Sequence, residues 1–153
     1  MKKVLIAVDD SKGSQATIDN FAELFSCTRF ESVVLLYVEK IEGKSLMDEM
    51  LGPAELSTLK EQLQGTAYQE ALDRKAHAVL EHYRQALVRA GASGIKTVVK
   101  QGHPADEVLE AAREEGADMI VVGSRGKRLH TVLMGSVSRE IANRAEVPVL
   151  IAR

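Results

Sequence analysis

Short apolar runs alternate along the chain with segments in which apolar residues recur at helical spacing. The apolar runs span 4–8, 33–38, 95–99, 119–123 and 147–152. All but 95–99 are continuous rather than alternating, which is typical of parallel strands covered on both faces. The segments predicted to be helical span 16–25, 67–90, 104–114 and 136–144. The pattern therefore predicts strands and helices that alternate along the chain.

This alternation indicates an α/β fold, because parallel strands need a crossover connection that is usually a helix. The chain has 153 residues, of which 45% are hydrophobic, which is enough for one domain with a single core. We therefore expect residues 1–153 to form one Rossmann-like domain, an open five-stranded parallel sheet sandwiched by helices.

The segment 40–66 interrupts the alternation and is too long for an ordinary connection. Its leucines and methionines recur close to helical spacing, so we expect a partly helical excursion on the surface. A lid or a partner-binding element is the alternative reading of this segment.

Composition excludes several classes of partner. The net charge is -2 and aromatic residues make up 4% without any tryptophan, which argues against nucleic-acid or anionic-membrane binding. Cys27 is the only cysteine, so neither an intrachain disulfide nor a multi-cysteine metal site can form. The apolar run 4–8 is too short for a signal sequence or a membrane span, and we expect a cytoplasmic protein.

Candidate binding residues follow three of the predicted strands, since ligands of open α/β sheets bind beyond the carboxyl ends of the strands. Asp9 follows the first strand, Val38 ends the second and Gly123 ends the fourth. Gly123 opens two glycine-serine segments, Gly123-Ser124-Arg125-Gly126 and Gly135-Ser136-Val137-Ser138. Glycine allows a phosphate to approach the backbone, and Ser136 is a suitable N-cap for a helix whose free N–H groups attract anions. The same residues also suit a tight turn and a capped helix without any ligand.

Residues that would support catalysis or metal binding are not apparent. The chain contains no Gly-x-Ser-x-Gly motif, and Cys27 has no sequence cue for a partner base. His77 and His82 share a predicted helix but diverge by about 140°, which does not favour a shared metal. His103 precedes Pro104 in a loop and is interpreted as structural or solvated. We expect no metal site, and at most very slow ATP hydrolysis.

Four segments together resemble the universal stress protein family. They are the strand 4–8 with Asp9-Asp10-Ser11, the segment Gly102-His103-Pro104, the stretch 117–126, and the stretch from Gly135-Ser136 to 147–151. The ATP-binding members of that family share a pattern similar to Gly-x2-Gly-x9-Gly-Ser/Thr. Here the last spacer, 127–134, has eight residues instead of nine.

This resemblance implies the strand order 3-2-1-4-5 and ATP as ligand, with Mg²⁺ as an accompanying ion. Asp9 and the backbone of Val38 are expected at the adenosine end, and the glycine-serine segments at the ribose and phosphates. The complete set of nucleotide-binding residues expected is Val8, Asp9, Val38, Val122, Gly123, Arg125, Gly126, Gly135, Ser136, Val137 and Ser138.

Two functions therefore remain open at this point. The first is an ATP-binding stress-response or regulatory protein, and the second is a nucleotide-free dimeric scaffold. In both, we expect a homodimer through the apolar C-terminal strand 147–152. Pro148 suits a strand start or a sheet edge, and the resemblance implies dimerisation through this strand.

Overall fold

The computed structural model describes residues 2–27, 30–40, 58, 66–124 and 134–153. Arg125 and Gly126 lie outside these residues, as do nearly all of the 127–134 spacer and the predicted excursion 40–66. The described elements are, in chain order, β1 (Lys3–Val8), α1 (Lys12–Cys27), β2 (Ser32–Glu39), α4 (Ala67–Arg89), β3 (Ile95–Gln101), α5 (Pro104–Glu115), β4 (Met119–Gly123), α6 (Ser136–Arg144) and β5 (Val149–Ala152).

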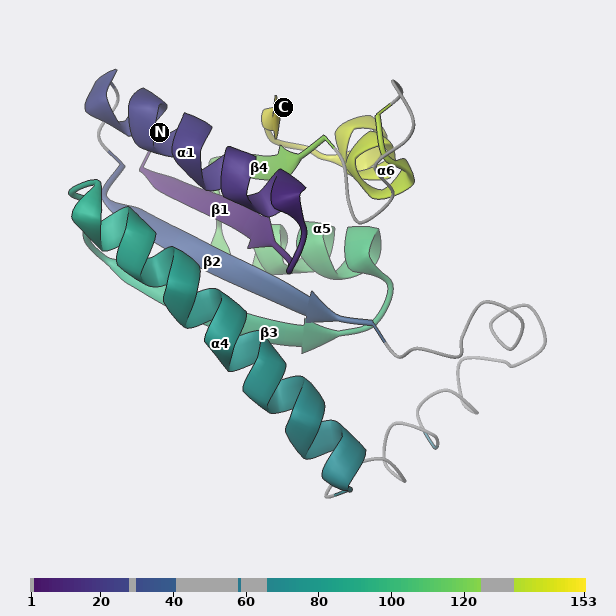
Figure 1. Ribbon diagram of the computed structural model, residues 1–153. Coiled ribbons are helices and arrows are strands. Elements are labelled where there is room, and N and C mark those ends of the chain that lie inside the picture. Colours follow the sequence, from purple (N-terminus) through teal and green to yellow (C-terminus); the bar gives the residue numbers. More distant parts are fainter. Residues whose placement is uncertain (1, 28–29, 41–57, 59–65, 125–133) are drawn as a thin grey trace.

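The strands form one parallel sheet of five strands in the order β3-β2-β1-β4-β5 (Figure 1). The predicted α/β class, strand count and strand order are therefore confirmed. The order reverses at β1, where β2 lies on one side and β4 on the other. Such a reversal leaves a crevice outside the carboxyl ends of the strands, which is where open α/β sheets bind their ligands.

Helices cover both faces of the sheet. Helices α1 and α4 lie over one face, and α5 and α6 lie over the other (Figure 1). Alternate residues of β2 enter the two cores, with Leu35 facing α1 and α4 and Leu36 facing α5 and α6, and both are fully buried. Burial on both faces explains why the strand sequences are continuous apolar runs.

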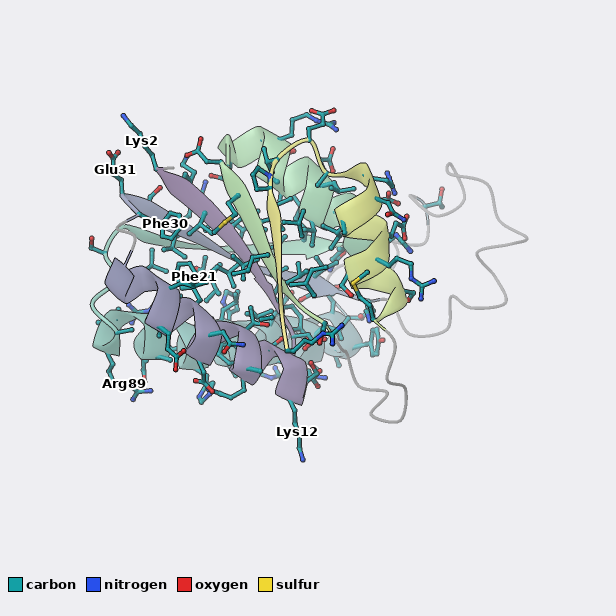
Figure 2. The ribbon with its side chains drawn as sticks, turned by 90° about the horizontal axis from the view of Figure 1, so that it is seen from above. Lys2, Lys12, Phe21, Phe30, Glu31 and Arg89 are labelled. Carbon is teal, nitrogen blue, oxygen red and sulfur yellow. The ribbon has the colours of Figure 1, made fainter. Side chains whose placement is uncertain are left out.

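Phe21 and Phe30 contribute an aromatic contact to the core beneath α1. Their rings are stacked with centroids 5.5 Å apart, and Figure 2 shows both side chains between the helix and the sheet. Lys12 instead points away from the core at the start of α1. The described helices do not include one that is both long and apolar enough to cross a membrane.

Two elements begin two or more residues away from their predicted starts. Helix α1 begins at Lys12, before the predicted 16–25. The prediction missed its first turn because the residues there are polar and show no apolar periodicity. Strand β5 begins at Val149 rather than at 147. Pro148 has no N–H to donate to β4, although its carbonyl accepts a hydrogen bond of 3.0 Å from the Ile120 N–H.

At the amino ends of the strands, the Asp118 side chain joins β1 to β4. Asp118 Oδ2 accepts hydrogen bonds from the backbone N–H groups of Lys2 (2.7 Å) and Lys3 (2.8 Å). These backbone hydrogen bonds, from Lys3 first and then from Lys2, lower the pKa of the Asp118 carboxyl. The contact therefore ties β1 to β4 at the amino ends of the strands, which is the end of the sheet opposite the crevice.

Candidate functional site

A pocket of about 710 Å³ lies at the carboxyl ends of β1, β2 and β4, with walls from α5 and α6. This volume is within the range of about 300–1,000 Å³ that is usual for small-molecule sites. The structure brings together in this pocket every predicted site residue that it describes, namely Val8, Asp9, Val38, Val122, Gly123, Gly135, Ser136, Val137 and Ser138.

The two carboxylate oxygens of Asp9 have different surroundings. Its Oδ1 accepts hydrogen bonds from the Ser11 N–H and the Ser14 hydroxyl, both at 2.8 Å. The Asp9 N–H donates in turn to Ser14 Oγ at 2.7 Å. These bonds hold the turn from β1 into α1, and within the described residues they leave Asp9 Oδ2 available to a donor in the pocket.

The neighbouring Asp10 has a different role from Asp9. Its Oδ2 lies 2.7 Å from Lys75 Nζ of α4, on the other side of the turn. Asp10 is absent from the pocket lining. Of the two adjacent carboxylates after β1, Asp9 is therefore the one placed to meet a ligand.

The N-terminus of α6 opens into the pocket without a side-chain cap. Gly135 occupies the N-cap position, and within the described part of the chain no side chain accepts a hydrogen bond from the first turn. The prediction that Ser136 is the N-cap is wrong, because the helix begins at Ser136 itself. Among the described residues, no acceptor faces the N–H groups of Ser136, Val137 and Ser138. Free N–H groups and the helix dipole make this end of α6 a favourable position for an anion.

The two serines of this turn also differ in their contacts. Ser138 is buried, and its Oγ donates to the Gly135 carbonyl at 3.0 Å and lies 3.4 Å from the Ser124 carbonyl. Ser124 also accepts a hydrogen bond of 2.8 Å from the Gly135 N–H, which joins the two ends of the glycine-rich segment. Ser136 is exposed in the pocket, and within the described chain its hydroxyl has no hydrogen-bond partner.

Gly123 is required by packing as well as by its place in the pocket. A Cβ at this position would lie 2.9 Å from the Gly13 carbonyl oxygen and 3.0 Å from Thr17 Oγ1. Thr17 Oγ1 donates to that same carbonyl at 2.8 Å, so these atoms of α1 are held in place. The end of β4 therefore approaches α1 too closely for a side chain.

Sequence reasoning missed several residues of the pocket wall. Lys40 and Arg139 contribute positive charge, and Pro104, Val108 and Met134 contribute apolar surface. The Arg139 guanidinium donates to the Met134 carbonyl at 3.3 Å. Pro104 at the start of α5 was part of a recognised motif, but Lys40 and Arg139 carry no local signal that distinguishes them from surface cations.

Comparison with known proteins identifies the family of the chain. The model described as "Universal stress protein family" matches residues 1–153. The chain belongs to the universal stress protein family. It is 28% identical over 156 residues to universal stress protein MJ0577 of Methanocaldococcus jannaschii, covering 99% of this chain and 94% of that protein. The solved structure of MJ0577 has a TM-score of 0.70 at 26% identity, with the same coverage of 99% and 94%.

Two further solved structures share the fold at lower identity. A universal stress protein in complex with cAMP has a TM-score of 0.66 at 23% identity, covering 99% of this chain and 96% of its own. One from Archaeoglobus fulgidus in complex with dAMP has a TM-score of 0.61 at 18% identity, covering 100% and 98%. At these identities, the likeness demonstrates the shared architecture.

Proposed function

We propose that this universal stress protein is a regulatory protein that binds an adenine nucleotide, with ATP as the ligand and Mg²⁺ as its accompanying ion. The observation that carries the proposal is the uncapped N-terminus of α6, which opens into a pocket at the point where the strand order reverses. Two proteins of the same fold were crystallised with cAMP or dAMP, which supports an adenine nucleotide as the class of ligand.

The chemistry of the lining divides the pocket into two ends. Val38 lies near the end of β2 and Asp9 follows β1. We assign both to the adenosine, with Asp9 Oδ2 accepting from a ribose hydroxyl. Ser136, Val137 and the backbone of Gly135 lie at the start of α6, and we assign them to the phosphates. Arg125 and Gly126 are assigned to the phosphates on the sequence pattern alone.

Two cations of the pocket favour a charged ligand over a neutral nucleoside. Lys40 follows β2 and Arg139 lies in the first turns of α6, and both are exposed at the lining. A polyphosphate carries several negative charges, so hydrogen bonds to these cations and to the helix N–H groups are of the stronger, charge-assisted kind. The positive charge therefore supports ATP rather than adenosine.

Hydrolysis by this site is proposed to be slow. The described lining contains one carboxylate, Asp9, and its Oδ1 is already used by two donors of the turn. Lys40 and Arg139 can stabilise charge on phosphate, but neither is a base that positions an attacking water. A turnover above roughly 1 s⁻¹ would be typical of a working enzyme and would contradict this assignment.

The proposal is tested by titrating the purified chain with ATP, AMP and adenosine by calorimetry, with and without Mg²⁺. We expect one site, with ATP binding tighter than AMP and adenosine binding weakest. Acid release of ligand from freshly purified protein gives an independent measurement of co-purified nucleotide. Absence of binding at millimolar ATP, together with no released nucleotide, would favour the dimeric scaffold instead.

We further propose a homodimer in which β5 pairs with its own copy. β5 is the last strand at one margin of the sheet, and its residues Val149, Leu150 and Ile151 are only half-buried. A groove of about 340 Å³ beside it is lined by Leu150 and Ile151 and by Leu24 of α1, which is 42% exposed. An unpaired apolar edge favours pairing, and a two-fold axis closes the assembly.

A further inference from the structure

A second cluster of polar side chains lies outside the pocket, where the start of α5 meets α6. It consists of His103, Asp106 and Glu140, and one ligating atom from each lies within 4.8 Å of the other two. His103 is the N-cap residue of α5, Asp106 lies one turn later, and Glu140 belongs to α6. His103 and Asp106 are thus neighbours along the chain, and the packing of α5 against α6 brings Glu140 to them.

Arg144 donates a hydrogen bond to one oxygen of each carboxylate in this cluster. Its Nη1 lies 2.7 Å from Asp106 Oδ1 and 2.7 Å from Glu140 Oε1. These hydrogen bonds raise the pKa of the Arg144 guanidinium. Each carboxylate therefore directs one oxygen to Arg144 and retains a second oxygen on its other side.

The second oxygens face the imidazole of His103 without bonding well to it. Asp106 Oδ2 is 3.4 Å from His103 Nδ1, and Glu140 Oε2 is 3.9 Å from His103 Nε2. Both distances exceed the usual 2.7–3.2 Å of a hydrogen bond. An ion-pair network thus explains the position of Arg144. It leaves a second oxygen of each carboxylate beside the imidazole, that of Asp106 near Nδ1 and that of Glu140 near Nε2. One ligating atom of each residue still lies within 4.8 Å of the other two.

We propose that His103, Asp106 and Glu140 form a binding site for Zn²⁺ or a similar transition-metal dication. Imidazole with carboxylates suits Zn²⁺, whereas Mg²⁺ and Ca²⁺ prefer oxygen ligands alone. Bonds of about 2.0–2.2 Å in tetrahedral geometry place the ligating atoms about 3.4 Å apart. All three side chains are at least partly exposed. A single ion binds one imidazole nitrogen, so the proposed site requires these side chains to turn from their present arrangement toward that nitrogen.

Local charge sets the expected strength of this site. Arg144 and the positive end of the α5 dipole oppose a cation, while Asp106, Glu107 and Glu140 favour one. We therefore expect weaker binding than at a structural zinc site made of cysteines. The bound ion would link α5 to α6. Pro104 follows His103 and Arg139 precedes Glu140, and both of these neighbours line the pocket. The proposal does not depend on nucleotide binding.

The test is a titration of the full chain with Zn²⁺ by calorimetry in the absence of nucleotide. We expect one site, and His103→Ala or Glu140→Gln should each weaken it at least tenfold. Arg144→Ala should tighten it several-fold, because the variant removes the competing cation from both carboxylates. His77→Ala, a histidine exposed elsewhere on α4, should bind like the parent.

Co²⁺ absorption provides a second readout that reports coordination directly. The parent chain should show the visible bands of a four- or five-coordinate ion with a nitrogen ligand, and His103→Ala should lose them. Circular dichroism of each variant checks that the fold is retained. Equal Zn²⁺ affinity in His103→Ala and the parent, or weaker binding in Arg144→Ala, would show that the cluster is an ion-pair network only.

Discussion

Ser136 and Ser138 lie two residues apart in the first turn of α6, yet of the two only Ser136 presents a free hydroxyl to the pocket among the described contacts. Ser136→Ala should weaken ATP binding by roughly tenfold to 150-fold. The hydroxyl would donate to a charged phosphate, and such a bond is worth about 1.5–3 kcal/mol. The measurement is calorimetric titration with ATP, with His77→Ala as the control that should bind normally. Unchanged ATP affinity in Ser136→Ala would show that the phosphates do not bind at this turn.

Gly123 offers a second test at the residue scale, one of stability. Gly123→Ala should lower the free energy of unfolding by about 1–3 kcal/mol, as expected for overpacking. The added Cβ would lie 2.9 Å from the Gly13 carbonyl, a backbone atom that cannot move cheaply. Urea denaturation measures the loss. Gly135→Ala is the matched control, because Gly135 has φ -60 and ψ 154, a conformation that alanine adopts without strain. Equal stability of Gly123→Ala and the parent would contradict the packing argument.

At the scale of elements, Asp118 connects the first residues of β1 to β4, and its effect should depend on pH. The folded pKa of Asp118 is lowered, so its contribution to stability is present above the unfolded pKa near 3.8 and is lost as pH falls through the folded value. Asp118→Asn should therefore be less stable than the parent at pH 7, and the difference should shrink at pH values below 3.8. Urea denaturation of both chains across this range measures it.

The control for this prediction is Glu146→Gln at an exposed position after α6. This substitution changes the formal charge by the same amount. Its free energy of unfolding should differ less from that of the parent, and the difference should vary little with pH. A stability gap between Asp118→Asn and the parent that stays constant from pH 7 into acid would show that the carboxylate charge is not the cause.

At the scale of the whole molecule, the open margin at β5 predicts the oligomeric state. The carbonyl of Pro148 accepts a bond from Ile120 in β4, and that of Ala152 accepts one from Ser124 directly after β4. By alternation, the N–H of Ile151 therefore faces the open edge. Ile151→Pro should remove one bond of the proposed strand pair while leaving the pairing with β4 intact, because proline is tolerated on an edge. Sedimentation equilibrium should show a dimeric parent at micromolar concentration and a mainly monomeric variant.

Leu150→Lys adds a second, harsher perturbation of the same strand. Leu150 packs partly against the core beneath α1, so a lysine there should yield monomers or insoluble protein. A parent chain that sediments as a monomer would contradict the dimer regardless of either variant. A dimer that persists in Ile151→Pro would place the interface elsewhere on the surface.

The sequence by itself determined the order and approximate bounds of the described strands and helices, and the end of the sheet at which the pocket lies. Continuous apolar runs report burial on both faces, and strand-helix alternation requires parallel strands, so these features follow from local pattern alone. Asp9, Val38 and Gly123 were predicted because residues at the carboxyl ends of parallel strands meet at one end of the sheet.

Only the tertiary structure decided which side chains act at that edge and how. Lys40 and Arg139 reach the pocket, and Gly123 meets Gly13, through packing between segments far apart in the chain. The N-cap at Gly135 rather than Ser136 likewise depends on the bond between Gly135 and the end of β4. Periodicity records which face of an element is buried, but it carries no information on what lies across the interface. Contacts between His103, on α5, and Glu140, on α6, therefore appear only once the helices are packed together.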